Sequence, residues 1–326
     1  MSVRQSSFRP SSLSRRRFLK GMGLAGAAVS TAQLSSAPAQ AQAQQPLNRA
    51  ELVTELAAEH FRIRRQPIQW PNNARIAVFW VVDFEVFSDN STSYDIAYHD
   101  YSGKAGFWRL LDLAEENGVK FGWYTNAIIA TRYPETLREA ARLGHEIDGH
   151  GWSNNTSLIT VSAEVEREII RRVFADIEKA AGVRPTGWLG SGWNTSNRTL
   201  EYLAEEGILW NGDYPIDDLP YTVPVKGKKI VIIPYVRESN DIQTYGPHRH
   251  SPQVWLDNFK EQFDVLYDEG EKYPQMVSAA MHSWLLGHPV GKRAIREAIR
   301  YTKGFPNVWQ TTENEMAKWW LQQNYD

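Results

Sequence analysis

The stretch "RIAVFWVVDFE", residues 75–85, decides the fold of this chain. An unbroken apolar run, residues 76–82, is followed by Asp83, Phe84 and Glu85. Such a run is typical of a strand that is buried on both faces, as in a parallel sheet. Because successive side chains of a strand point to opposite faces, we expect Asp83 and Glu85 on the same face at its carboxyl end. The two acids either cap the strand or belong to a site, and their shared face favours a site.

Strand-like and helix-like segments alternate along the rest of the chain. Ser162 is expected to cap a long helix that ends at Gly182. The apolar face of that helix is expected to consist of Val165, Ile169, Val173 and Ile177. Further strands are expected within residues 120–126, 145–151, 186–191, 208–213, 229–236, 276–284 and 308–311, and further helices within 107–118, 134–144, 196–206, 253–269, 292–303 and up to 320.

About seven strands, each followed by a helix or a long loop, predict an α/β barrel. An open doubly wound sheet is the alternative architecture. In such barrels the site is built at the carboxyl ends of the strands, and polar residues occur where these strands are expected to end. They are Asp83, Glu85, Asn126, His150, Ser191, Asp213, Asp241 and His282.

The N-terminal residues carry the pattern of an export signal. Basic "SRRRFLK", residues 14–20, precedes a small-residue apolar run and the A-x-A sites of "APAQAQA", residues 37–43. The paired arginines indicate a twin-arginine signal, with a plain Sec signal or a basic tail as the alternatives. We therefore expect a signal peptide over residues 1–43, a single catalytic domain over 44–326, recognition by the twin-arginine machinery, and a periplasmic or secreted location.

Charge and composition exclude several classes of function. Loss of residues 1–43 removes six basic residues and no acid, which takes the formal charge from −2 to −8. An acidic protein is a poor candidate for binding nucleic acid. The chain has no cysteine, so disulfides, thiolate metal sites and a cysteine nucleophile are excluded. The sequence leaves open whether the chain forms a homo-oligomer.

Four motifs, in order, resemble those of the polysaccharide deacetylase (NodB-homology) superfamily. They are "VVDFE", "GHEIDGHGWSNN", "WNGDYPIDD" and "AAMHSW". Four more segments, "RPTGW", "DDLPY", "IPYVRESND" and "FDVLYDEG", resemble the branch of the bacterial metal-independent allantoinase and related cyclic-amide hydrolases. The resemblance implies a distorted seven-stranded barrel and hydrolysis of carbon–nitrogen bonds other than peptide bonds.

The resemblance also implies roles for individual residues. Asp83 takes the place of the catalytic base and His282 that of the catalytic acid. Glu85 and His150 take the places of metal ligands, and Asn154 stands where the family has its second metal histidine. The arginine that usually holds the base has no counterpart in "GWLGSGW", and Arg184 lies too early in the sequence to replace it.

The exchange of histidine for Asn154 leaves the metal question open. Imidazole, carboxylate and amide oxygen form a weaker ligand set that is still compatible with Zn²⁺, Mn²⁺ or Co²⁺. A mechanism without metal is the equal alternative, and Asn154 is then either a hydrogen-bonding group or an ordinary turn residue in "SNNTS".

Two substrate classes fit this resemblance: a small cyclic amide or imide, and an N-acetylated glycan. A non-catalytic glycan-binding protein with a decayed site is the alternative, although the presence of both Asp83 and His282 argues against it. His145 is expected to be structural, and the loop with His248 and His250 to form a lid. Tryptophans and acids near the strand ends are candidate substrate contacts, with core packing or a solvated loop as the alternatives: Trp152, Trp188, Asp213, Asp217, Asp218, Asp241 and Trp284.

Overall fold

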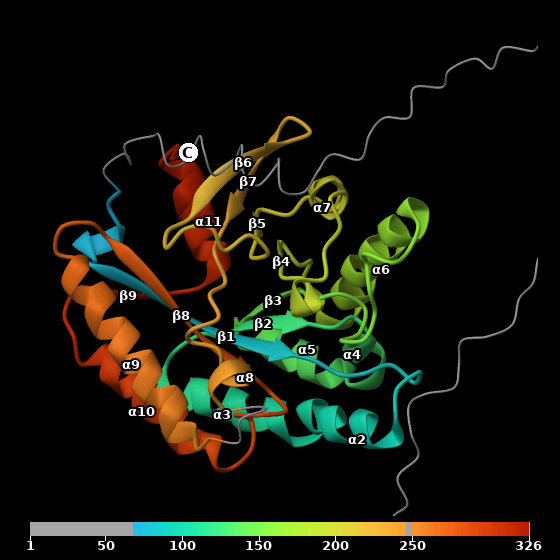
Figure 1. The fold of residues 1–326 in the computed structure, drawn as a ribbon, viewed down its shortest axis with the longest axis horizontal. Coiled ribbons are helices and arrows are strands. Elements are labelled where there is room, and N and C mark those ends of the chain that lie inside the picture. Colours follow the sequence, from blue (N-terminus) through green and yellow to red (C-terminus); the bar gives the residue numbers. More distant parts are fainter. Residues whose placement is uncertain (1–67, 246–249, 326) are drawn as a thin grey trace, which may run out of the picture. The chain divides into compact units, whose positions relative to one another are not determined.

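Strand β1 (Ile76–Phe84) is the apolar run that opened the sequence, and it lies in the middle of a single sheet (Figure 1). The computed structural model describes residues 68–245 and 250–325. The proposed signal segment and His248 therefore lie outside the described residues. All described residues fall in one compact unit.

Strands and helices alternate as the sequence predicts, with small shifts at their ends. The remaining strands are β2 (Gly122–Thr125), β3 (Glu146–Gly149), β4 (Gly187–Trp188), β5 (Trp210–Asn211), β6 (Tyr221–Val225), β7 (Lys228–Ile232), β8 (Gln275–His282) and β9 (Val308–Thr311). The α-helices are α2 (Ser93–Tyr101), α3 (Phe107–Asn117), α4 (Ile128–Arg132), α5 (Pro134–Arg142), α6 (Ala163–Ala181), α7 (Thr199–Glu206), α8 (Asp241–Thr244), α9 (Pro252–Glu269), α10 (Gly291–Lys303) and α11 (Glu313–Gln322). Short helical turns η1 (Pro71–Asn73), η2 (Ser102–Gly106) and η3 (Ser191–Trp193) complete the list.

The sheet is a curled half-barrel. Its strand order is β6-β7-β5-β4-β3-β2-β1-β8, and β9 pairs with the first half of β1. All pairs are parallel except β6 with β7, an antiparallel hairpin that the sequence analysis missed. Between β7 and β8 a single bridge, Asn240 to Ala280, spans the opening. The predicted distorted α/β barrel is confirmed, and the seven strands expected for it are β1 to β5, β7 and β8.

Alternation along β1 assigns its side chains to two separate cores. Even-numbered residues such as Trp80 and Val82 pack outward against the helices. Odd-numbered residues such as Phe79 and Val81 point into the barrel with Tyr124, Trp210 and other interior side chains. Asp83 continues the interior series at the carboxyl end of the strand, so the sequence places its carboxylate inside the barrel mouth.

The helices cover the outer face of the curled sheet (Figure 1). Helix α6 is capped by Ser162 and ends before Gly182, as predicted. Its buried face is rotated from the expected one, because Ile170 and Phe174 join Val173 and Ile177 while Val165 is 48% exposed and Ile169 only partly buried. The predicted i, i+4 series began too early, because the N-terminal turns of α6 lie outside the core.

Helix α11 closes the amino-terminal end of the barrel. Glu313 accepts a hydrogen bond from the Tyr124 hydroxyl, and Asn314 accepts bonds from Thr186 and from the Trp210 indole. Both ends of the strands are therefore polar, but only the carboxyl end collects acids together with histidines. Within the described part of the chain, no helix has the length and apolar character needed to cross a membrane.

Candidate active site

Four predicted residues converge at the carboxyl ends of β1, β3 and β8. Asp83, Glu85, His150 and His282 are each at most 5% exposed. Nε2 of His150 lies 2.9 Å from Oε1 of Glu85 and 3.8 Å from Oδ1 of Asp83. Nε2 of His282 lies 3.5 Å from Oδ2 of Asp83 and 3.6 Å from Oε2 of Glu85. The arrangement brings together the residues predicted as base and acid and two of the three predicted metal ligands.

Strand register and glycines bring these side chains together. Asp83 is paired with His282 on β8 and with Tyr124 on β2. His150 follows β3 directly, and Gly151 after it has φ 75°, a conformation that favours glycine and turns the chain away from the pocket. The amide of Asn126 and the hydroxyl of Ser191 both donate to the main-chain carbonyl of His150, which fixes its position.

Asp83 is held by a phenol rather than by an arginine. The Tyr235 hydroxyl donates to Oδ2 of Asp83 over 2.5 Å, and the Asn240 amide donates to that hydroxyl over 2.8 Å. Oδ1 of Asp83 is buried without a hydrogen-bond partner. Burial raises the pKa of Asp83, against the opposing charges of His282 and His150. The carboxylate therefore has one fixed oxygen and one oxygen that is free to accept a proton.

Glu85 accepts hydrogen bonds from three side chains. His150 donates to Oε1, while the Asn154 amide and the Trp284 indole both donate to Oε2 over 3.1 Å. Burial alone would raise the pKa of Glu85, but the charge of His282 and the bond from His150 outweigh it and lower that pKa to about 2. Glu85 is therefore a permanent anion with both oxygens engaged.

His150 forms a buried ion pair with Glu85. Its Nδ1 lies 2.6 Å from the carbonyl oxygen of Leu189, so Nδ1 carries a hydrogen and donates it. Burial opposes its charged form, yet the hydrogen bond to Glu85 and the charges of Asp83 and Glu85 raise the pKa of His150. Two acceptors, one at each ring nitrogen, and the raised pKa favour the imidazolium form of His150.

His282 is kept protonated by Asp241. Oδ1 of Asp241 accepts the Nδ1–H of His282 over 2.7 Å, and Oδ2 accepts its main-chain N–H over 2.9 Å. Burial opposes the charge of His282, but Asp241, and after it Asp83 and Glu85, raise its pKa to about 10. Its Nε2–H faces the pocket without a short hydrogen bond, which suits a proton donor.

The converging side chains line a small pocket with a volume of about 190 Å³. The polar side chains already described form its floor together with Asn154, Tyr235 and Asn240. Its walls come from two loops: Leu189, Gly190, Gly192 and Trp193 on one side, and Ile242 on the other. Drug-sized ligands occupy pockets of roughly 300–1,000 Å³, so this one accommodates only a small molecule or a single end group.

The residues at the expected metal position do not fit a metal ion. A zinc site with an open position needs three good protein ligands, and of the three predicted ligands only Glu85 and His150 offer a carboxylate or an imidazole. Asn154 turns its NH₂ group to Glu85, and Trp284 adds an indole N–H, which cannot ligate a metal. No group of three or more His, Asp or Glu suited to a metal occurs among residues 68–245 and 250–325.

Four predicted substrate contacts near the site have other roles. Asp241 is fully buried and bonded to His282, so it positions that ring. Trp284 is 9% exposed and donates to Glu85. Trp188 is fully buried and stacks on Phe174 in the outer core. Trp152 packs on that core under Arg172, outside the pocket lining. None of the four lines the pocket, which proximity to a strand end does not reveal, so a direct contact with substrate stays a prediction.

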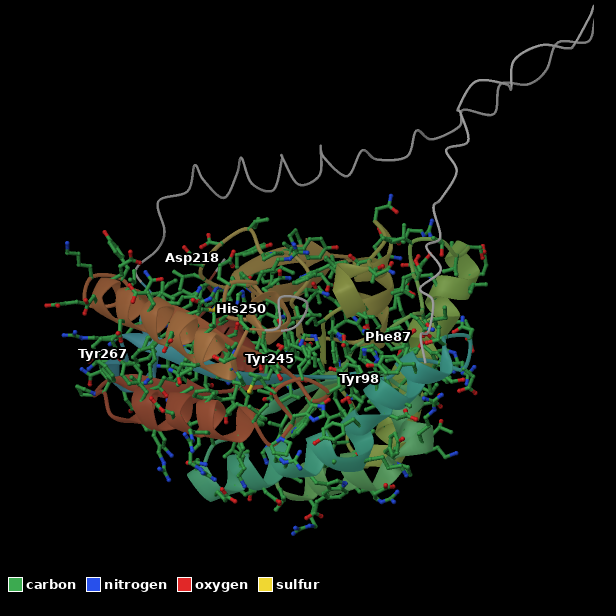
Figure 2. The ribbon with its side chains drawn as sticks, turned by 60° about the horizontal axis from the view of Figure 1, so that its bottom comes forward. Phe87, Tyr98, Asp218, Tyr245, His250 and Tyr267 are labelled. Atoms are coloured by element: carbon green, nitrogen blue, oxygen red, sulfur yellow. The ribbon has the colours of Figure 1, made fainter. Side chains whose placement is uncertain are left out.

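The acids between β5 and β6 also lie outside the pocket lining. Asp213 accepts hydrogen bonds from the Gly190 main chain and the Asn211 side chain, and so ties two loops together. Asp217 accepts the N–H of Leu219. Phe87 lies two residues after Glu85 and marks the site end of β1. Figure 2 shows Asp218 well apart from Phe87. These three residues are therefore loop and surface groups rather than pocket groups.

Two further residues are placed away from the pocket, and three polar or aromatic pocket residues were missed. His145 is structural: its Nδ1 accepts the N–H of Phe121. Arg184 is a surface residue that pairs with Glu178 and Glu206, so it does not hold the base. Tyr235 and Asn240 lie in "IPYVRESND", a segment that indicated the allantoinase branch but no site residue. Trp193 lies in "GWLGSGW". A tyrosine three residues after the end of β7 was the available signal.

Comparison with known proteins agrees with these motifs. Residues 91–209 match the protein family described as polysaccharide deacetylase. A protein of Schizosaccharomyces pombe whose name places it with the polysaccharide deacetylases is 25% identical over 296 residues, covering 77% of this chain and 92% of that protein. The peptidoglycan deacetylase of Helicobacter pylori is 28% identical over 148 residues, covering 45% of this chain and 50% of that protein.

Solved structures share the whole fold. The crystal structure of Puue allantoinase has a TM-score of 0.74 and 27% identity, and the match covers 79% of this chain and 95% of that chain. A Pseudomonas aeruginosa PAO1 structure, named among the polysaccharide deacetylases, has a TM-score of 0.73 and 27% identity over 79% and 96% of the two chains. The resemblance that the motifs indicated is confirmed for both branches.

The pair formed by Asp241 and His282 predicts the alkaline limit of activity. His282 must be protonated to act as an acid, so the rate is retained below its pKa of about 10 and falls as pH rises through that value. Asp241→Asn keeps an oxygen for the Nδ1–H but removes the charge that favours the imidazolium. We expect Asp241→Asn to move the alkaline limb of kcat/KM to lower pH. Asp257→Asn, at an exposed position of α9, is the control. An unchanged limb in Asp241→Asn would contradict the assignment.

Proposed function

We propose that this member of the polysaccharide deacetylase (NodB-homology) superfamily hydrolyses a carbon–nitrogen bond of a small, non-peptide amide or imide without a metal. The observation that carries the proposal is the geometry of one pair. The free oxygen of Asp83 and the free N–H of His282 face the same small pocket, and each is fixed from behind by another buried side chain.

Asp83 acts as the general base. Its unpartnered Oδ1 accepts a proton from a water molecule, while Tyr235 holds Oδ2. A carboxylate whose pKa is raised takes up a proton more readily than an ordinary aspartate. Such strengthening is useful where no metal lowers the pKa of the water. The activated water then attacks the carbonyl carbon of the substrate.

Cationic groups stabilise the tetrahedral intermediate. His150 is an imidazolium at the pocket wall, and its charge favours the oxyanion that forms on the carbonyl oxygen. The Asn154 amide lies at the same wall and supplies N–H groups. Glu85 keeps His150 charged by pairing with it. The role of Glu85 is therefore to maintain the positive charge of His150 rather than to transfer a proton.

His282 acts as the general acid. As the carbon–nitrogen bond breaks, its Nε2–H is delivered to the leaving nitrogen, and Asp241 stabilises the ring during the transfer. Nε2 of His282 lies 3.5 Å from Oδ2 of the same carboxyl group. The proton that Oδ1 took from water returns to the imidazole when the products leave. The reaction consumes one water and restores both groups.

The dimensions of the pocket favour a small substrate over a polymer. A volume of about 190 Å³ with Trp193 as its tryptophan suits a single ring rather than a glycan chain. The second candidate is an N-acetylated glycan, which the peptidoglycan deacetylase relative supports. A glycan-binding protein with a decayed site stays the third reading, and the intact base and acid argue against it.

Export through the twin-arginine pathway, release of residues 1–43, a catalytic domain over 44–326 and a periplasmic or secreted location are part of the proposal. They rest on the sequence "SRRRFLK" and the A-x-A sites alone. The twin-arginine pathway carries folded proteins, so a barrel with a buried charge cluster could assemble before transport. A homo-oligomer is compatible with these features but has no observation in its favour.

A direct assay separates the three readings. We expect the chain to open the ring of hydantoin or succinimide and to release no acetate from tri-N-acetylchitotriose. Asp83→Asn and His282→Ala should each lower kcat by about 10²–10⁴, with the native fold of each variant checked by circular dichroism. Asp218→Asn, on the surface, serves as the control. Acetate release alone would favour the glycan deacetylase, glycan binding without turnover would favour the decayed site, and near-normal kcat in either variant would refute its role.

The export proposal has its own test. Arg15→Lys combined with Arg16→Lys keeps the charge of the signal but removes the paired arginines. We expect the uncleaved precursor to accumulate in the cytoplasm, as followed by fractionation and immunoblotting. Unimpaired export from a host that lacks the twin-arginine machinery would show that the signal belongs to another pathway.

A further inference from the structure

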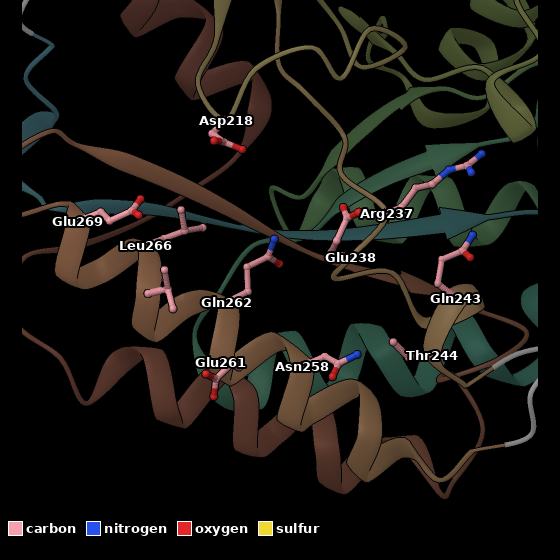
Figure 3. Close-up of a pocket in the computed structure, with 11 residues that line it drawn as sticks. Asp218, Arg237, Glu238, Gln243, Thr244, Asn258, Glu261, Gln262, Leu266 and Glu269 are labelled. Atoms are coloured by element: carbon pink, nitrogen blue, oxygen red, sulfur yellow. The ribbon is translucent and has the colours of Figure 1, made fainter.

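Arg237 is an exposed cation at the border of two cavities. It lines a groove of about 790 Å³ along α9, here called the α9 groove, whose other polar residues include Asp218, Glu238, Gln243, Asn258, Glu261 and Glu269 (Figure 3). Despite these carboxylates, Arg237 makes no ion pair within the described part of the chain. Figure 3 shows its side chain directed away from Asp218 and Glu269, toward the carboxyl end of β1.

The guanidinium is held instead by an aromatic ring of the catalytic pocket. Its central carbon lies 4.4 Å from the centroid of the Trp193 ring. A cation at this distance over an indole is attracted by the ring quadrupole and loses part of its mobility. Because Trp193 forms part of the wall of the catalytic pocket, this contact places the guanidinium of Arg237 at the pocket rim.

The backbone at Trp193 is built to present this ring. Trp193 has φ 53° and follows Gly192 with φ 58°, and a bulky residue in the left-handed region is strained. The turn is held by main-chain bonds from Trp193 to Gly190 and from Asn194 to Ser191. Backbone strain of this kind persists where the surrounding structure enforces it, and it is concentrated at binding sites.

We propose that Arg237, carried on the indole of Trp193, binds a carboxylate of the substrate at the rim of the catalytic pocket and so selects amides or imides that bear such a group. This inference rests on the proposed function and names its substrate class. The pocket floor holds the carboxylates of Asp83 and Glu85, which would repel an anionic substrate. A planar guanidinium offset from that floor binds the carboxylate in a bidentate manner and turns the reacting carbonyl toward Asp83.

Two matched probes test the inference by binding alone. They are hydantoin-5-acetate and its neutral methyl ester, which share the ring and differ in charge. Calorimetry is carried out on the full chain with Asp83→Asn, which prevents turnover. We expect the acid to bind about 10- to 100-fold more tightly than the ester, as for one charge-assisted hydrogen-bonded pair. Adding Arg237→Gln should raise the Kd of the acid to that of the ester. The Kd of the ester should stay unchanged.

Arg172→Gln is the matched control. Arg172 also stacks on an indole, that of Trp152 at 4.6 Å, but this ring is outside the pocket lining. We expect it to keep the preference for the acid. Equal binding of acid and ester, no binding of the acid, or a preference that survives Arg237→Gln would overturn the inference.

Turnover by the wild-type chain then separates this inference from the proposed function. Ring opening of the ester without any preference for the acid would sustain the proposed function and sink the role of Arg237. A preference for the acid that depends on Arg237, without turnover of either probe, would sustain the binding role and sink the proposed hydrolysis.

Discussion

The structure of the pocket depends on the compensation of buried charge. Three carboxylates and two imidazoles lie together, each almost completely removed from water, and an isolated ion in such a place would be very costly. The cluster persists because every anion faces a cation or an N–H donor: Glu85 faces His150, and Asp241 faces His282. The pKa values shift accordingly, downward for Glu85 and upward for both histidines. Catalytic protonation states are thus a product of the same pairing that makes the cluster tolerable.

Compensation also explains what Asn154 does in this chain. In a metal site the cation balances the carboxylates, whereas in the proposed metal-free site the protein supplies that balance through imidazolium and N–H groups. A second histidine would add a group that competes for Glu85, while an amide adds a neutral donor. The Tyr235 hydroxyl follows the same logic at Asp83, because a neutral donor orients the base and lowers its pKa less than the charge of an arginine would.

Much of this arrangement could be predicted from the sequence. The alternation of strands and helices, starting with the apolar run before Asp83, predicted the barrel. The polar residues at the strand ends predicted four residues of the pocket, because the side chains of a strand alternate between its two faces. Three kinds of feature were out of reach. The direction of Trp188 and Trp152 depends on how far each short strand extends, the partner of His282 depends on a loop that crosses the barrel opening, and Tyr235 acts through a contact between residues far apart in the chain. Residue types at strand ends locate a site, but tertiary packing decides which of them face it.

The central claim is that protein side chains alone balance and use this charge cluster. The most direct measurement is the activity of the purified chain after exhaustive chelation, followed by separate addition of Zn²⁺, Mn²⁺ and Co²⁺, with the metal content of each sample determined in parallel. The account predicts full activity in the metal-depleted chain and no gain from any ion. Loss of activity on chelation, restored by one of the three ions at a stoichiometric content, would contradict it.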